Sequence, residues 1–132
     1  MNADDDRFKV GYAELKRAAW LEVDLEAIRH NLRALRGLIG PRVKIMAVIK
    51  ANGYGHGIIQ VAKTAMDGGA QQLGVAMLQE ALELRKANIA CPILVLGCSL
   101  PEMAHDIIYN RLTQTVSSVQ MGKALSEAAC SL

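Results

Sequence analysis

Apolar residues recur at helical spacing over residues 25–39, and this is the first regular pattern in the chain. Asp24 precedes it as a typical helix N-cap, Glu26 suits the first turn of the helix dipole, and Gly40 supplies a stop. A short apolar segment at residues 19–23 indicates a strand before this helix. One face of the predicted helix carries five apolar residues: Leu25, Ile28, Leu32, Leu35 and Ile39.

Beyond residue 40 the pattern changes to apolar runs rich in Val, Ile and Leu, which alternate with stretches of helical period. This alternation is the signature of successive β-α units, and four such units fit the chain. Strands that are apolar throughout are typical of a parallel sheet covered by helices. The predicted strands span residues 43–49, 72–77, 92–96 and 112–116. The predicted helices span residues 57–67, 79–88 and 101–109, with a last helix from about Val119 to the chain end.

Two architectures accommodate consecutive β-α units: an open doubly wound sheet and a (β/α)8 barrel of the TIM type. A complete barrel needs about 200 residues at least, so four units in 132 residues would form only its first half. In the barrel interpretation, residues 1–17 are a polar, mobile leader and residues 18–132 are the N-terminal part of an α/β barrel domain. The first and fourth strands would then have open edges, which natural folds avoid, and we expect a truncated chain.

The composition, 52% hydrophobic and 21% charged, is that of a globular domain with a real core. Basic and acidic residues, 15 and 13 in number, are interspersed, so the chain has no concentrated basic face for nucleic acid or anionic lipid. The acidic N-terminus lacks the order of a secretory signal, and no apolar run approaches membrane-spanning length. We therefore expect a cytoplasmic protein with neither nucleic-acid nor membrane partners.

The most informative segment is Lys50-Ala-Asn-Gly-Tyr-Gly-His-Gly57, which follows the first predicted parallel strand. Ligands bind at the carboxyl ends of the strands in β-α folds of either kind. A lysine there has its amine at the ligand-binding edge and its stem against the core, a placement that suits the carbonyl chemistry of a Schiff-base lysine. The glycines let backbone amides approach a ligand, the following helix offers a positive N-terminus to phosphate, and Tyr54 adds a hydroxyl. A lysine that ends a strand is more often simply solvated, so spacing alone leaves both interpretations open.

Other interpretations of this segment fit less well. A dinucleotide loop has the spacing G-x-G-x-x-G, whereas Gly57 comes one position too early after Gly53 and Gly55. Neither a P-loop nor a Gly-x-Ser-x-Gly hydrolase motif is present. We expect His56 to be hydrogen-bonded locally and assign it no role. We expect reduced, mostly buried thiols and find no metal-ligand spacing among the other histidines and the cysteines: His30, His105, Cys91, Cys98 and Cys130.

The segment from Lys50 to Gly57 closely resembles the cofactor-lysine signature of bacterial alanine racemases. Gly53 departs from the commonest form, in which alanine is frequent. Further segments are similar to the same family in order and approximate spacing, so the resemblance covers nearly all of residues 19 to about 116. They are the opening segment Trp20-Leu-Glu-Val-Asp-Leu-Glu-Ala-Ile-Arg-His-Asn31, the second strand and helix Leu73-Gly-Val-Ala-Met-Leu-Gln-Glu-Ala81, and the third strand Pro92-Ile-Leu-Val-Leu-Gly97.

The resemblance implies an eight-stranded β/α barrel that carries pyridoxal phosphate, followed by a mainly β C-terminal domain. It implies that Lys50 binds the cofactor as a Schiff base and acts as the base on the D-alanine side. Tyr54 would hydrogen-bond the cofactor phosphate, and Leu96 would pack near the pyridine ring. The second proton-transfer group would be a tyrosine from a partner subunit, which implies a homodimer. Neither Tyr12 nor Tyr109 lies in a comparable motif.

The function that the resemblance implies is pyridoxal phosphate-dependent interconversion of L-alanine and D-alanine, which supplies D-alanine for peptidoglycan. The chain alone is expected to be inactive, because it supplies one of the two proton-transfer groups that racemisation needs. Two alternatives stay open: another barrel enzyme of this type acting on a D-amino acid, and a non-catalytic barrel that binds pyridoxal phosphate. The Tyr-Gly-His-Gly continuation after Lys-Ala-Asn favours alanine racemase.

Overall fold

The computed structural model describes residues 19–131, and its centre is a parallel sheet of four strands in the order β1-β2-β3-β4. Each strand pairs with the next one along the chain. The strands are β1 (Met46–Val48), β2 (Gln72–Val75), β3 (Ile93–Val95) and β4 (Thr113–Gln114). Val48, Gly74, Leu94 and Thr113 are register partners across the four strands. The sheet is therefore built from consecutive β-α units, and this prediction is confirmed.

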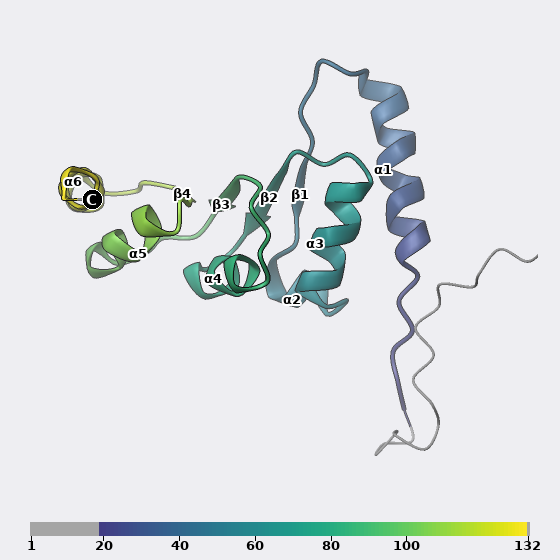
Figure 1. Cartoon of the computed structure of the whole chain (residues 1–132), viewed down its shortest axis with the longest axis horizontal. Coiled ribbons are helices and arrows are strands. Elements are labelled where there is room, and N and C mark those ends of the chain that lie inside the picture. Colours follow the sequence, from purple (N-terminus) through teal and green to yellow (C-terminus); the bar gives the residue numbers. More distant parts are fainter. Residues whose placement is uncertain (1–18, 132) are drawn as a thin grey trace, which may run out of the picture.

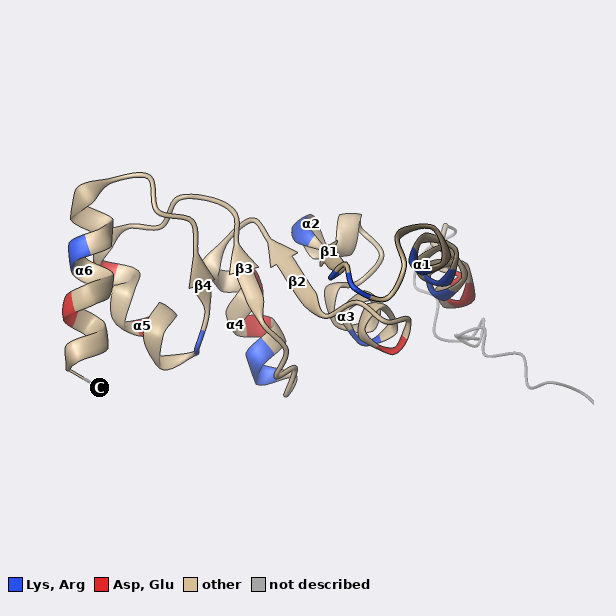
Figure 2. Ribbon diagram, turned by 90° about the horizontal axis from the view of Figure 1, so that it is seen from above, with Lys and Arg blue, Asp and Glu red and all other residues tan. Residues whose placement is uncertain are grey.

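Helical segments follow the strands: α2 (Lys50–Tyr54), α3 (Ile58–Asp67), α4 (Leu78–Lys86), the 3-10 turn η2 (Pro101–Met103), α5 (Ala104–Tyr109) and, after β4, α6 (Val119–Cys130). In Figure 2 the helices α3, α4 and α5 lie along one face of the sheet. Sequential strand order with helices on one face is typical of a barrel segment, whereas a doubly wound sheet has helices on both faces. Of the two architectures left open by the sequence, the structure favours the barrel.

The hydrophobic core lies between the sheet and these helices. Leu73, Val75, Ile93 and Val95 are fully buried there. Burial of such a side chain stabilises the fold by about 1.5–3 kcal/mol, more than the roughly 0.5–1.5 kcal/mol of a ladder hydrogen bond, so this interface holds the short strands together. Side chains alternate along a strand, so Gly74 and Leu94 face the other side of the sheet.

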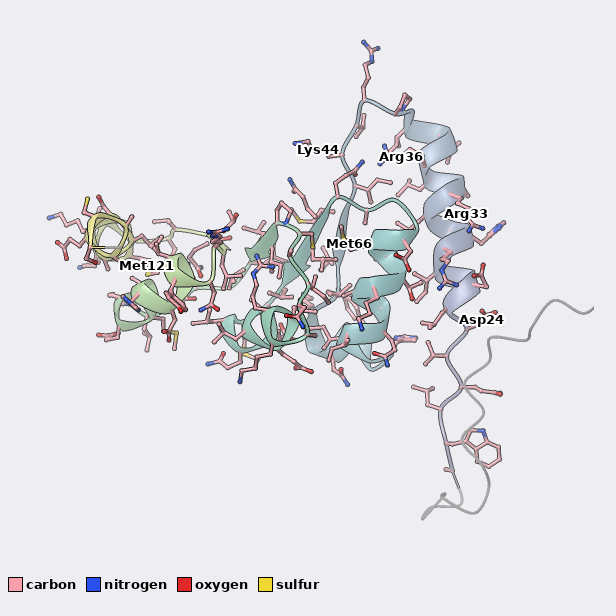
Figure 3. The ribbon with its side chains drawn as sticks, viewed as in Figure 1. Asp24, Arg33, Arg36, Lys44, Met66 and Met121 are labelled. Atoms are coloured by element: carbon pink, nitrogen blue, oxygen red, sulfur yellow. The ribbon has the colours of Figure 1, made fainter. Side chains whose placement is uncertain are left out.

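The helix α1 (Leu25–Ile39) precedes the sheet and packs against α3 (Figure 1). The Asp24 carboxylate accepts hydrogen bonds from two first-turn amides at 2.9 and 3.2 Å, which confirms it as the N-cap. The helix ends at Ile39, and its C-cap is Gly40, whose φ of 73° favours glycine. Arg36 points from α1 toward the segment that leads into β1 (Figure 3), and its guanidinium donates to the Gly40 and Gly69 carbonyls. Arg36 thus ties α1 to the amino-terminal end of the sheet.

Two predictions about strands need correction. Residues 19–23 form no strand, because this segment leaves α1 away from the sheet (Figure 1) and none of the described strands lies beside it to form a ladder. The four sheet strands are also shorter than predicted. At β1 the Ile45 amide donates to the Gln71 side chain at 2.8 Å instead of joining the ladder, so the strand begins at Met46.

The predicted leader, residues 1–17, lies outside the described residues, and the domain division stays a prediction. Within residues 19–131 no helix combines the length and the apolar character needed to cross a membrane. Figure 2 shows basic and acidic residues interspersed along the described ribbon. This distribution matches the interspersed charges of the sequence.

Candidate functional site

The carboxyl end of β1 leads into a left-handed turn that begins at Lys50. Ala51, Asn52 and Tyr54 have φ angles of 52°, 54° and 55°, and Gly53 between them has 63°. A left-handed conformation costs an L-residue about 1–2 kcal/mol, so three such residues around one glycine store strain. Strained backbone persists only where surrounding contacts hold it, and it is concentrated at functional sites. The turn is therefore a candidate site on conformational grounds alone.

Hydrogen bonds within the turn maintain this conformation. The Gly53 amide donates to the Ile49 carbonyl at 2.8 Å, and the Gly57 amide donates to the Asn52 carbonyl at 2.9 Å. The Gly55 amide also donates inside the turn, at 3.0 Å. The amides of all three glycines are thus engaged within the turn, and the expectation that backbone amides of this segment approach a ligand stays a prediction.

The side chain of Asn52 reaches the start of the next helix. Its Oδ1 accepts a hydrogen bond from the amide of Ile58, the first residue of α3, at 2.9 Å. This bond links the left-handed turn rigidly to α3. It also occupies one of the first-turn amides of α3, and the expectation that this helix N-terminus suits a phosphate stays a prediction.

Glu80 connects this turn to the neighbouring β-α unit. Its Oε1 accepts a hydrogen bond from the Ala51 amide at 2.6 Å, and its Oε2 accepts from the amides of Ala76 and Met77 at 2.8 and 3.2 Å. Sequence reasoning missed this residue. The signal that could have found it is its position, because a glutamate three residues after a helix N-cap commonly bonds the N-cap amide.

The predicted site residues lie at the carboxyl edge of the sheet. Lys50 is half-buried directly after β1 and Ile49, and its amine makes no hydrogen bond or ion pair within the described residues. Tyr54 ends the turn with 59% of its surface exposed. Leu96 follows β3 and is 39% exposed; a Cβ at Gly74 would lie 3.5 Å from its Cδ1. The structure brings these residues to one edge, while their roles stay predictions.

The remaining candidates have structural explanations. His56 Nδ1 lies 2.9 Å from the Gly53 carbonyl, so the expectation of a local hydrogen bond is confirmed. Within residues 19–131 no group of three or more His, Cys, Asp or Glu could hold a metal ion.

The expectation of mostly buried thiols is wrong for two of the three cysteines. Cys98 is exposed because it lies in the loop after β3, and Cys130 is exposed at the last residue of α6. Cys91 is half-buried, and desolvation raises its pKa, against a smaller opposing effect of the Arg85 charge. All three cysteines are free in the structure.

Comparison with known proteins places these features in a family. The family model described as the N-terminal domain of alanine racemase matches residues 23–131. The alanine racemase of Desulforamulus reducens is 45% identical over 115 residues, which are 87% of this chain and 31% of that protein. The chain thus spans about a third of the length of this relative.

Solved structures agree with this match. The crystal structure of alanine racemase from Bacillus anthracis with bound L-Ala-P has a TM-score of 0.73 and 43% identity, over 80% of this chain and 27% of that one. A histidine racemase from Leuconostoc mesenteroides has a TM-score of 0.73 and 35% identity, over 80% of this chain and 28% of that one. The four-stranded sheet corresponds to the N-terminal half of the barrel in alanine racemase structures.

Proposed function

This chain belongs to the alanine racemase family, and from that premise we propose that Lys50 holds pyridoxal phosphate and moves the α-proton in the interconversion of L-alanine and D-alanine. The observation that carries the proposal is Lys50 itself, which is half-buried at the carboxyl edge of the sheet and whose amine has no ion pair among residues 19–131. An amine held in an ion pair would first have to leave its partner before it could react with a carbonyl. The Lys50 amine needs no such step.

The side chains at this edge suit the three chemical parts of the cofactor. The Lys50 amine can react with an aldehyde carbon. The exposed Tyr54 hydroxyl, which has no hydrogen-bond partner in the described part of the chain, can donate to a phosphate oxygen. The partly exposed Leu96 side chain offers an apolar surface to a pyridine ring. The amine, the hydroxyl and the apolar side chain together support the assignment of pyridoxal phosphate.

Each of these side chains has a separate part in the proposed mechanism. Pyridoxal phosphate, when bound, withdraws electrons from the α-carbon of an amino acid and makes its proton removable. Lys50 Nζ takes this proton, or returns it, on one face of the α-carbon. Tyr54 orients the phosphate, and Leu96 keeps water away from one side of the ring. The strained turn that begins at Lys50 fixes the backbone from which its side chain reaches the substrate.

Racemisation needs a second proton-transfer group on the opposite face of the α-carbon. Tyr109 does not suit this role, because it ends α5 and lies next to the start of β4, at the end of the sheet opposite to Lys50. Tyr12 lies outside the described residues. We propose that a tyrosine of a partner subunit supplies the group, that the active form is a homodimer, and that it works in the cytoplasm to supply D-alanine for peptidoglycan.

Trapping of the cofactor tests the assignment of Lys50. The chain is incubated with pyridoxal phosphate and reduced with borohydride, and the modified peptide is mapped by mass spectrometry. We expect the adduct on Lys50, its loss in Lys50→Ala, and its retention in Lys63→Ala, which removes an exposed lysine of α3. Modification elsewhere, or none in the unaltered chain, would contradict the proposal.

The similarity to a histidine racemase keeps a second substrate open. Exchange of the α-hydrogen for deuterium needs only one proton-transfer group, so it can compare substrates separately from racemisation. We expect the chain with pyridoxal phosphate to exchange the α-hydrogen of D-alanine faster than that of D-histidine, with Lys50→Ala as the blank. Faster exchange of D-histidine would change the substrate assignment, and negligible inversion is expected in both cases.

A further inference from the structure

We propose that Glu80 is a positioning residue that fixes the direction of the Lys50 side chain by holding the peptide unit directly after it. The inference rests on the proposed role of Lys50. The carboxylate of Glu80 lies between two adjacent loops at the carboxyl edge, one after β1 and one after β2, and each of its oxygens bonds a different loop. Glu80 follows Ala51 by 29 residues in the sequence, so this contact is a tertiary one.

The bond to Ala51 acts on the backbone of Lys50 itself. The Ala51 amide belongs to the peptide unit whose carbonyl carbon is that of Lys50, so a bond of 2.6 Å to this amide restrains ψ of Lys50. No carbonyl among the described residues accepts from this amide. Glu80 is thus the group that orients this peptide unit at the start of the turn.

The left-handed turn makes this restraint necessary. Ala51 and Asn52 have φ angles of 52° and 54°, which most L-residues avoid, so the turn needs contacts that outweigh its strain. A hydrogen bond between an amide and a carboxylate is roughly twice as strong as one between neutral groups. Release of the Ala51 amide would let the turn relax and would widen the range of Lys50 directions.

The geometry distinguishes this role from ordinary helix capping. A glutamate at the third position of a helix commonly bonds the amide of its own N-cap, and Glu80 does so through Oε2 and Met77. Oε1 is not needed for that purpose and instead bonds the neighbouring unit. Glutamine has a single acceptor oxygen, so Glu80→Gln must lose the bonds on one of the two sides.

The test compares Glu80→Gln with Glu83→Gln. Glu83 is on the same helix and is exposed, and its carboxylate makes no hydrogen bond or ion pair within the described residues, so it is a matched control. Two quantities are measured: the concentration dependence of pyridoxal phosphate trapping on Lys50, and hydrogen exchange of the Ala51, Ala76 and Met77 amides by NMR. We expect half-saturation of trapping to need about tenfold more cofactor in Glu80→Gln, with faster exchange at Ala51. Glu83→Gln should match the unaltered chain in both.

Equal trapping and equal Ala51 exchange in the two variants would overturn the proposal. Faster exchange only at Ala76 and Met77, with unchanged trapping, would also overturn it, because Glu80 would then act as a helix cap alone. If Glu80→Gln does not fold, the unaltered chain decides: a protected Ala51 amide supports the bond, and an unprotected one refutes it. Failure of the unaltered chain to trap cofactor on Lys50 contradicts the proposed function instead, while the exchange data still decide whether Glu80 holds the turn.

Discussion

Arg85 Nε in α4 donates a hydrogen bond of 2.9 Å to the carbonyl of Asn110, which follows α5. The same guanidinium donates to the carbonyls of Cys91 and Arg111, each at 3.0 Å. These acceptors lie in the segments that enter β3 and β4, so one side chain joins two neighbouring β-α units. This end of the sheet is opposite to Lys50, and in barrels it serves stability rather than catalysis. Burial lowers the pKa of the Arg85 guanidinium, but arginine stays charged in proteins.

We predict that Arg85→Ala lowers the free energy of unfolding by about 2–3 kcal/mol, because several backbone carbonyls lose a charged donor at once. The free energy of unfolding of Arg85→Lys should lie between those of the unaltered chain and Arg85→Ala, since an ammonium lacks the planar fork that reaches separate segments. Urea denaturation followed by circular dichroism measures both. The neighbouring Lys86→Ala is the control and should stay within about 0.5 kcal/mol of the unaltered chain. Equal losses in the Arg85→Ala and Lys86→Ala variants would show that the guanidinium contacts contribute nothing.

Asn52 is expected to matter for the fold as well as for the site. Asn52→Ala removes the acceptor of the Ile58 amide and places alanine at a φ of 54°, so we predict a loss of about 1–2 kcal/mol in the free energy of unfolding. Asn52→Asp keeps both an acceptor oxygen and tolerance of this conformation, and it should remain close to the unaltered chain. The measurement is again urea denaturation. An Asp variant as unstable as the Ala variant would contradict the capping role.

Tyr54 can be tested through the phosphate group alone. We predict that Tyr54→Phe lowers the affinity of trapping for pyridoxal phosphate several-fold, because one neutral hydrogen bond is worth about 0.5–1.5 kcal/mol. Trapping of pyridoxal, which has the aldehyde but no phosphate, should be unchanged. Tyr109→Phe removes another exposed phenol and is the control. A loss of similar size for both aldehydes would assign Tyr54 a role other than phosphate binding.

The thiols should differ in reactivity with pH. The thiolate is the reactive form, and burial raises the pKa of Cys91, so at mildly alkaline pH it carries less thiolate than an ordinary cysteine. We predict that iodoacetamide modifies the exposed Cys98 and Cys130 first, with Cys91 following only as pH rises further or in urea. Mass spectrometry of timed samples gives the order. Modification of Cys91 as early as Cys98 in the folded chain would contradict the burial argument.

The raised pKa of Cys91 also makes the free energy of unfolding depend on pH. A folded-state pKa above the unfolded value means that the folded chain retains this proton to a higher pH than the unfolded chain does. The stabilisation is fully present below the unfolded pKa and is lost as pH rises through the folded pKa. Cys91→Ser should therefore flatten part of the alkaline decline in the free energy of unfolding.

Much of this fold can be predicted from local patterns in the sequence. The helical period over residues 25–39 and the Asp24 N-cap depend only on near neighbours, and both are found as predicted. The position of Lys50 follows from the order of the elements, because every strand in consecutive β-α units ends at the same edge. The strand predicted at residues 19–23 fails for the complementary reason, since a strand exists only where another chain segment pairs with it.

The conformation of the site depends on contacts that no local pattern contains. Ala51 and Tyr54 have no preference for positive φ, so composition alone gives no reason to expect a left-handed turn at these residues. The bond between Glu80 and Ala51 exists because β1 and β2 are adjacent and end at the same level. A capping glutamate can be predicted from its spacing, but the second partner of its carboxylate requires the tertiary structure.

The sequential order of the strands has a consequence for how the protein is made. Because each strand pairs with the one synthesised just before it, no described strand has to wait for a partner from a later, non-adjacent unit. Units can therefore dock one after another as the chain leaves the ribosome. The turn at Lys50 emerges before its partner Glu80, which follows Ala51 by 29 residues. If Glu80 positions Lys50 as we propose, the lysine acquires its final orientation only when the second unit has been translated.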